Sequence, residues 1–148
     1  MMVDQFHLTD ECLNKIRQDA AIAVKNIESY AKDKVDVGTN TTYERGFVAK
    51  IEELKRNVNE KFDDLRGSVL KRRPSPGEAN YSTKLSKYEE FLQHATTGIS
   101  SMKRIFSELF AKLYDALKKI LQWIYEHRSE IIILIASLFV AILPILLN

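Results

Sequence analysis

Hydrophobic residues recur every three or four positions along most of the chain, which is the spacing of amphipathic α-helices. The first such run ends near Lys34, and Thr9 is its predicted N-cap. The second extends from about residue 42 to 70, opened by Thr41 and Glu44 at the spacing of a capping box. Their apolar positions are Leu13, Ile16, Ala20, Ala23, Ile27, Tyr30, Phe47, Ile51, Leu54, Val58, Phe62, Leu65 and Val69.

The third run carries the strongest pattern. After a Pro-, Gly- and Ser-rich segment at residues 71–82, which we interpret as a loop, twelve successive a and d positions of a heptad repeat hold no polar residue. A kink or break is predicted at Thr96, Thr97 and Gly98, which are poor helix formers. With Ala95 and Ala116 completing it, the predicted interaction seam is Leu85, Tyr88, Leu92, Ile99, Met102, Phe106, Leu109, Leu113, Ile120 and Trp123.

This seam is wider than a two-stranded coiled coil requires. Ile105, Phe110, Leu117 and Ile124 occupy flanking positions where charged residues usually set the partner. A broad apolar face suits either a multi-helix bundle or the surface of a bilayer. Residues 101–127 therefore form an amphipathic helix that either packs in the bundle or lies on the membrane.

The chain closes with IIILIASLFVAILPILLN, residues 131–148, in which no residue is charged. Thirteen of its residues are Ile, Leu, Val or Phe, and each favours insertion by roughly 0.3 to 0.6 kcal/mol at the bilayer centre. As a helix, the segment reaches about 26 Å against a hydrocarbon core of about 30 Å. We predict a single transmembrane anchor that includes Ile131, Leu134, Leu138, Phe139, Ile142 and Leu146.

An anchor in this position predicts a tail-anchored topology. No signal peptide is recognisable at the N-terminus, and the basic residues near the span precede it, so residues 1–130 are expected in the cytosol. The short span fits the endoplasmic reticulum or another intracellular membrane better than the plasma membrane. The expected organisation is an N-terminal helical hairpin at 1–70, a linker at 71–82, heptad-patterned helices at 83–130 and the anchor at 131–148.

Composition adds little chemistry to this picture. The net charge of +2 does not indicate nucleic-acid binding. The single cysteine, Cys12, lies on an amphipathic segment and is expected to be a small buried residue. Basic residues could contact anionic lipid headgroups. The candidates are Lys71, Arg72, Arg73, Lys118, Lys119 and Arg128.

Candidate catalytic groups are scattered. His7, His94 and His127 lack the spacing that places two imidazoles on one helical metal-binding face. Adjacent carboxylates such as Asp63 and Asp64 point about 100° apart on a helix and cannot share a site. We therefore expect no enzyme, cofactor or small-molecule substrate.

In outline the chain resembles a SNARE protein, with Leu85 to Trp123 standing where the assembly layers would be and a C-terminal anchor after them. That resemblance implies a role in membrane fusion. The seam departs from the SNARE pattern because it lacks the Gln or Arg of a central layer.

These patterns predict an all-α fold: an elongated bundle of three to four helices followed by one C-terminal transmembrane helix. The leading functional hypothesis is a tail-anchored protein whose bundle oligomerises or binds a protein partner at the cytosolic face of a lipid bilayer. The alternative is a pore-forming, membrane-permeabilising or remodelling protein that uses helix 101–127 and the hydrophobic tail. A SNARE-like fusion protein is the third hypothesis.

Overall fold

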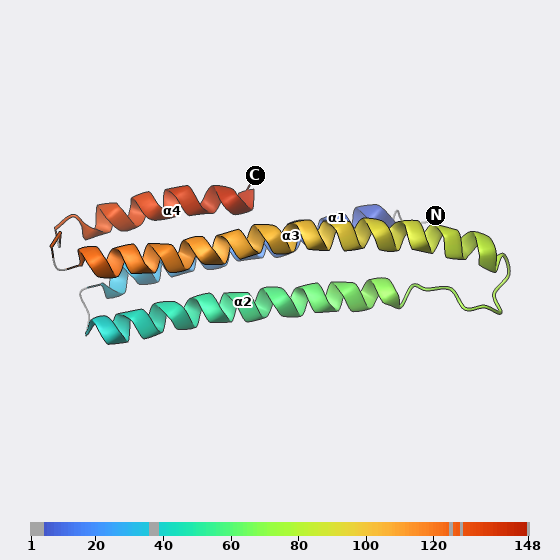
Figure 1. Cartoon of the computed structure of the whole chain (residues 1–148), viewed down its shortest axis with the longest axis horizontal. Helices are drawn as coiled ribbons and strands as arrows, with labels where there is room; N and C mark the ends of the chain where they lie inside the picture. The colour runs from blue at the N-terminus through green and yellow to red at the C-terminus, as the bar shows by residue number, and fades with distance from the viewer. Residues whose placement is uncertain (1–4, 36–38, 125, 128, 148) are drawn as a thin grey trace.

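A computed structural model describes residues 5–35, 39–124, 126–127 and 129–147. These residues form four α-helices: α1 (Gln5–Lys34), α2 (Asn40–Leu70), α3 (Tyr81–Trp123) and α4 (Ile131–Leu147). No strand occurs in the described ranges. Successive helices run antiparallel in an elongated bundle (Figure 1). The predicted all-α helical bundle is therefore confirmed.

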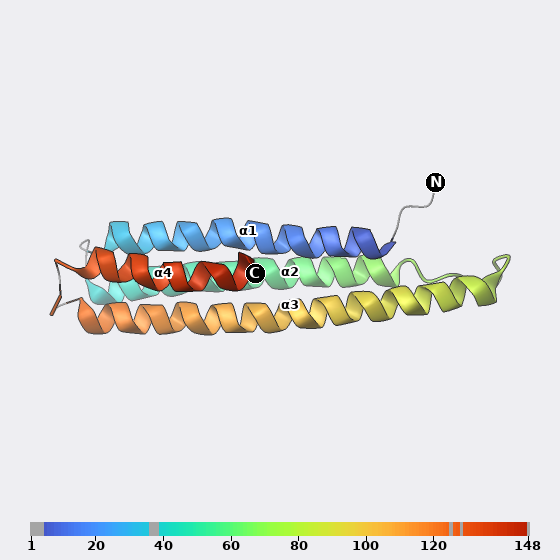
Figure 2. The same cartoon turned by 90° about the horizontal axis from the view of Figure 1, so that it is seen from above.

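α1 and α3 form a central pair, with α2 packed on one side of it and α4 on the other. α1 and α3 contact each other, and both contact α2 and α4. Among the described residues, α2 and α4 do not contact one another. Seen from above, α4 lies between α1 and α3, with α2 beneath the same pair (Figure 2). The first three helices thus form a packed unit, and α4 covers the groove between α1 and α3 on the side away from α2.

Both predicted helix starts need correction. α1 begins at Gln5 rather than after Thr9, which is buried within the helix. Tertiary contacts extend this end, because the Phe6 ring lies 4.7 Å from the His94 ring of α3. α2 begins at Asn40, where the Oγ of Thr39 accepts a hydrogen bond from the Thr42 amide at 3.1 Å. An ordinary Thr cap therefore replaces the expected capping box.

α3 passes through Thr96, Thr97 and Gly98 without a break, so the predicted kink is wrong. A Cβ on Gly98 would lie 2.9 Å from the Cδ1 of Leu13, which shows that α1 and α3 approach closely there. Both threonines are exposed. Tertiary packing outweighs the weak local propensity at this point.

The core follows the predicted helical faces. All seven apolar positions predicted for the second run are buried in α2, as are most of those predicted for α1. The half of α3 from Met102 onward packs inside the bundle, with Leu109, Leu113 and Ile120 fully buried. Aromatic rings connect the elements, and Phe62 of α2 meets Phe106 of α3 edge-on at 5.8 Å.

The C-terminal segment forms the predicted helix but not in the predicted setting. α4 has 17 residues and packs along α1 and α3. Of the helices in the described part of the chain, none combines the length and apolarity of a candidate membrane span. The transmembrane assignment of residues 131–148 is therefore not supported by this fold.

Candidate functional site

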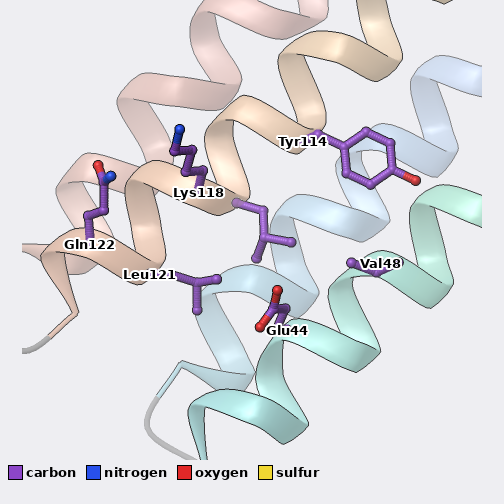
Figure 3. A pocket seen from close by; sticks show the side chains of 7 residues that line it. Glu44, Val48, Tyr114, Lys118, Leu121 and Gln122 are labelled. Atoms are coloured by element: carbon purple, nitrogen blue, oxygen red, sulfur yellow. The ribbon is translucent and has the colours of Figure 1, made fainter.

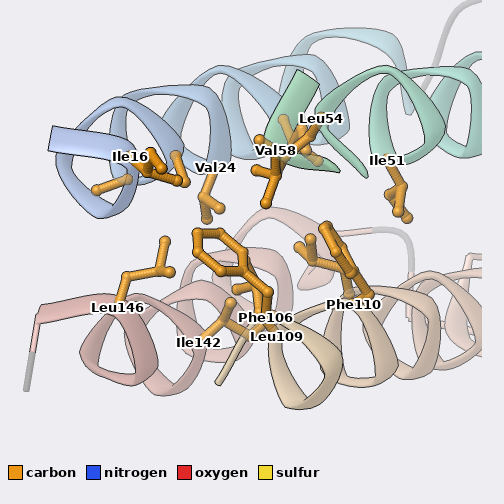
Figure 4. Packing of buried hydrophobic residues seen from close by; sticks show 14 of the residues in the cluster. Ile16, Val24, Ile51, Leu54, Val58, Phe106, Leu109, Phe110, Ile142 and Leu146 are labelled. Carbon is orange, nitrogen blue, oxygen red and sulfur yellow. The ribbon is translucent and has the colours of Figure 1, made fainter. Parts of the chain in front are cut away.

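The candidate site is α4 together with the α1–α3 groove that holds it. The buried face of α4 consists of large apolar residues that recur every three or four positions. In Figure 4, Leu146 and Ile142 point from α4 toward Ile16 and Val24 on α1. The fully or nearly fully buried residues of α4 are Ile131, Ile135, Phe139, Ile142 and Leu146.

The opposite face of α4 faces outward, and apart from Ser137 its exposed residues are apolar. Ile133, Val140 and Leu147 are 68%, 72% and 60% exposed. Their spacing of seven places them on one line along the helix. No charged residue lies anywhere between Ile131 and Leu147. Single exposed apolar residues are common on proteins, whereas contiguous exposed apolar patches are typical of interaction surfaces.

The six residues predicted as a membrane anchor divide between these environments. Ile131, Phe139, Ile142 and Leu146 belong to the buried face. Leu134 and Leu138 are partly buried at its edges. The residues most available to a bilayer are instead Ile133, Val140 and Leu147, which the sequence reasoning did not single out. A uniformly apolar segment gives no periodic signal that could separate an inner from an outer face.

The α3 seam mostly packs within its own bundle. Its eight buried members are Tyr88, Ala95, Met102, Phe106, Leu109, Leu113, Ala116 and Ile120. Leu85, Leu92 and Ile99 are partly buried. Trp123 is 40% exposed and its ring contacts that of His127, with the centroids 4.0 Å apart and the planes tilted by 33°. Little of this seam remains exposed for binding to another chain.

The candidate headgroup contacts do not gather in one place. Lys71, Arg72 and Arg73 follow the end of α2, whereas Lys118 and Lys119 lie near the end of α3, at the other end of the bundle (Figure 1). Lys119 pairs with Asp115 at 3.1 Å, and Arg72 lies over the Phe91 ring at 5.6 Å. All five are exposed. Arg128 lies outside the described residues.

The connection between α3 and α4 keeps helix-type hydrogen bonds. The His127 amide donates to the Trp123 carbonyl at 3.0 Å, and the Leu134 amide donates to the Glu130 carbonyl at 3.0 Å. Both bonds join residues four apart. Ile124 has helical backbone angles, φ −57° and ψ −32°, and is buried. Between these bonds the Glu130 amide donates to the His127 carbonyl at 2.9 Å, a bond between residues three apart.

Polar contacts fasten α1 to α2. Lys61 of α2 pairs with Asp19 of α1 at 2.9 Å, and this hydrogen bond lowers the pKa of Asp19. The Tyr43 hydroxyl donates to the Ala31 carbonyl at 3.0 Å, and burial raises the pKa of Tyr43. These bonds join α1 to α2 and leave α4 held by apolar contacts alone in the described contacts.

A surface depression of about 380 Å³ lies between α2 and α3 (Figure 3). Tyr114 reaches across it to donate a hydrogen bond to Glu52, and burial together with this bond raises the pKa of Tyr114 to about 12. Glu44 and Lys118 stand on opposite walls (Figure 3). Within the described ranges, no group of three His, Cys, Asp or Glu residues could hold a metal ion.

The candidate site is thus defined by the apolar helix α4 packed in the α1–α3 groove and not by a cluster of polar side chains. The chain matches no family model, no curated protein and no solved structure.

Proposed function

We propose that this protein is a non-enzymatic helical membrane protein in which α1–α3 form a cytosolic module and α4 is a tail anchor. In this proposal α4 occupies two settings, the α1–α3 groove before insertion and the bilayer afterwards. The module then oligomerises or binds a protein partner at the membrane surface. The observation that supports this most is the uncharged outer stripe of α4.

The two settings differ in how much apolar surface they remove from water. The groove covers one face of α4 and leaves Ile133, Val140 and Leu147 in solvent. A bilayer would cover both faces. Fully burying a large aliphatic side chain stabilises by about 1.5 to 3 kcal/mol, so the outer stripe favours lipid. The vacated groove opposes release, because its apolar lining must then be covered by lipid or protein.

The packing of the other helices favours a reversible release. α2 contacts α1 and α3 but not α4 among the described residues. Lys61 with Asp19, and Tyr43 with Ala31, also join helices other than α4. Loss of α4 from the groove therefore leaves the contacts between α1, α2 and α3 in place.

Vesicle flotation tests this proposal with a variant that spares the bundle. Val140→Lys places a charge on an exposed position, so the fold should be unaffected, whereas a charge at mid-span costs about 2.5 to 3.5 kcal/mol on insertion. We expect the wild-type protein to float with vesicles and Val140→Lys to remain below. Ile22→Lys, the same kind of change at an exposed apolar residue of α1, is the matched control and should float. Equal flotation of Val140→Lys and wild type would contradict the role of α4.

A membrane-permeabilising or remodelling protein is the second candidate. The observation in its favour is that α4 release uncovers an apolar groove on α1 and α3, which a lipid surface could cover. Dye release from vesicles separates the two candidates. Release by the wild type that Val140→Lys abolishes would favour permeabilisation, whereas binding without release would favour the anchored module. A SNARE-like role has less support, because most of the α3 seam packs inside its own bundle.

The proposed location is an intracellular membrane, with the bundle on the cytosolic side. An α4 length of about 26 Å suits a thin bilayer such as the endoplasmic reticulum, at about 27 Å. Carbonate extraction combined with protease protection in cells would measure integration and sidedness together. Protection of α1–α3 from an external protease in intact microsomes would contradict the proposed orientation.

A further inference from the structure

We infer that the α1–α3 groove also accepts α4 from a second copy of this chain, which gives an end-to-end, domain-swapped dimer. In this dimer α3 and α4 of each copy join into one continuous helix. The inference goes beyond the proposed function, because it requires no bilayer and concerns the protein in water.

The connection from Ile124 to Glu130 is chemically able to become helix. Its sequence, IYEHRSE, contains neither Gly nor Pro. The bond from the His127 amide to the Trp123 carbonyl already has the spacing of an α-helix. The Glu130 amide instead donates to the His127 carbonyl at 2.9 Å, and straightening must replace this bond between residues three apart by one between residues four apart. A turn with a proline or a left-handed glycine would have prevented this.

Side-chain contacts of the turn also survive in a straight helix. Trp123 and His127 are four residues apart, and His127 and Glu130 are three apart. Residues at these spacings are neighbours on a helix surface. The ring contact at 4.0 Å and the 3.7 Å His127–Glu130 contact are therefore compatible with both forms.

The apolar stripe of α3 continues into α4 in the straightened form. The half-buried His127 lies between the last buried position of α3 and the first of α4, at spacings of three and four. A continuous helix from Tyr81 to Leu147 would thus present one stripe. The α3 half would face its own α1, and the α4 half would face the groove of the second copy. The buried positions of this stripe are Leu113, Ala116, Ile120, Ile124, Ile131, Ile135, Phe139, Ile142 and Leu146.

The groove is complementary to this occupant because it already holds an identical one. A two-fold axis at the connection places α4 of one copy antiparallel to α3 of the other, which is the direction it has within one chain (Figures 1 and 2). Each copy regains the same apolar contacts that opening breaks. Exchange of an identical element is a low-cost route to dimers for this reason.

Cysteine trapping distinguishes this dimer from the monomer. In a Cys12→Ser background, Ile16→Cys and Leu146→Cys introduce thiols on the facing sides of α1 and α4, where Figure 4 shows Leu146 pointing toward α1. Monomer and dimer are separated by size exclusion at high protein concentration and then oxidised. We expect the monomer fraction to close a bridge within one chain and the dimer fraction to run as a covalent dimer on a non-reducing gel. A dimer fraction that runs as single chains, or a monomer at every concentration after refolding, would overturn the inference.

Hinge variants give an independent measurement. Glu126→Gly with Ser129→Gly weakens a continuous helix by roughly fivefold in equilibrium constant per glycine relative to alanine. The dimer dissociation constant should therefore rise at least about tenfold above that of the matched control, Glu126→Ala with Ser129→Ala. Equal dissociation constants for the two variants would overturn the inference.

Val140→Lys separates this dimer from one made through the outer stripe of α4. Val140 stays exposed in the swapped form, so Val140→Lys should still dimerise while losing vesicle binding. Loss of the dimer in this variant would mean that the outer stripe is the interface, which contradicts the swap. Failure of the swap with Val140→Lys still blocking flotation would leave the proposed membrane function standing.

Discussion

At the scale of single residues, Gly46 shows how closely α1 and α2 approach. A Cβ at this position would lie 1.7 Å from the Tyr30 hydroxyl oxygen. Tyr30 itself is stacked on Tyr43 at 6.0 Å, so it cannot move without disturbing that contact. A glycine inside a helix, normally unfavourable, is required here by the neighbouring ring.

Gly46→Ala should therefore lower the free energy of unfolding by about 1 to 3 kcal/mol through overpacking. Gly67, in the same helix, has no atom within 4 Å of an added Cβ. Gly67→Ala should instead raise the free energy of unfolding by about 0.5 to 1 kcal/mol through helix propensity. Urea denaturation of both variants measures the difference. Changes of the same sign would contradict the close approach at Tyr30.

Two tyrosines make stability sensitive to alkaline pH. The pKa of Tyr114 is raised to about 12 and that of Tyr43 is raised by burial. A raised folded-state pKa contributes stability that is complete below the unfolded-state value of about 10 and is lost as pH rises through the folded-state value. We expect tyrosinate absorbance to appear later in the native protein than in urea. Tyr43→Phe and Tyr114→Phe should each remove one late-titrating group of the six tyrosines. Identical native and denatured titrations would contradict this.

Residue-level details were the least predictable from sequence. Thr9 fits an N-cap, yet contacts of Phe6 with α3 extend the helix beyond it. Cys12 was predicted to be buried on an amphipathic helix, but it lies on the exposed side. For the start of α1 the deciding contact comes from another helix, and local pattern carries no information about that contact.

At the scale of elements, the sequence predicted where the helices lie far better than which helices pack against one another. The periodic apolar positions locate α2 and α3 because burial on one face requires that period. The ends of α4 were also predicted well, at Ile131 and Leu147. Its environment was not, because a segment that is apolar on every face suits a groove and a bilayer equally.

The two faces of α4 should respond differently to charge in water. Ile135 is fully buried and Val140 is mostly exposed. Ile135→Lys should lower the free energy of unfolding by several kcal/mol, because a lysine ammonium in the groove lacks a partner. Val140→Lys should change it by less than about 0.5 kcal/mol. Thermal melting followed by circular dichroism provides the comparison. A cooperative melt of Ile135→Lys at the wild-type temperature would show that α4 does not occupy the groove.

The middle of α3 is the element on which the bundle depends most. Leu113 has no exposed surface, whereas the adjacent Lys112 is exposed. Leu113→Asp should unfold the bundle or reduce its stability by several kcal/mol. Lys112→Asp, the neighbouring control, should retain a melting temperature close to wild type. Similar melting of both variants would mean that the seam is solvent-exposed.

At the scale of the whole molecule, the arrangement of the helices determines which surfaces α4 contacts. α2 and α4 lie on opposite sides of the α1–α3 pair and, among the described residues, none of their Cα atoms come within 8 Å of each other. The helical periods of the sequence could not predict this order. A stripe shows that a helix buries one face but does not identify the helix that covers it. The predicted choice between bundle and membrane surface for residues 101–127 depended on the same missing information.

Removal of α4 should leave a helical protein that self-associates. A chain ending at Glu130 keeps all contacts between α1, α2 and α3, so its helical circular dichroism should persist. Its uncovered groove should promote self-association and binding of a hydrophobic dye. Light scattering and dye fluorescence test this against the full chain. A truncated chain that is unfolded would show that α4 is an integral part of the core.

The separation of α2 from α4 also has a consequence during synthesis. α4 follows the other three helices in the sequence, so it is the last of the four to be synthesised. α1, α2 and α3 contact one another without α4, and helical domains fold in microseconds to milliseconds. A new chain in which α1–α3 have packed before α4 docks therefore has a vacant apolar groove. A chaperone or another nascent chain is then able to bind this groove before α4 does.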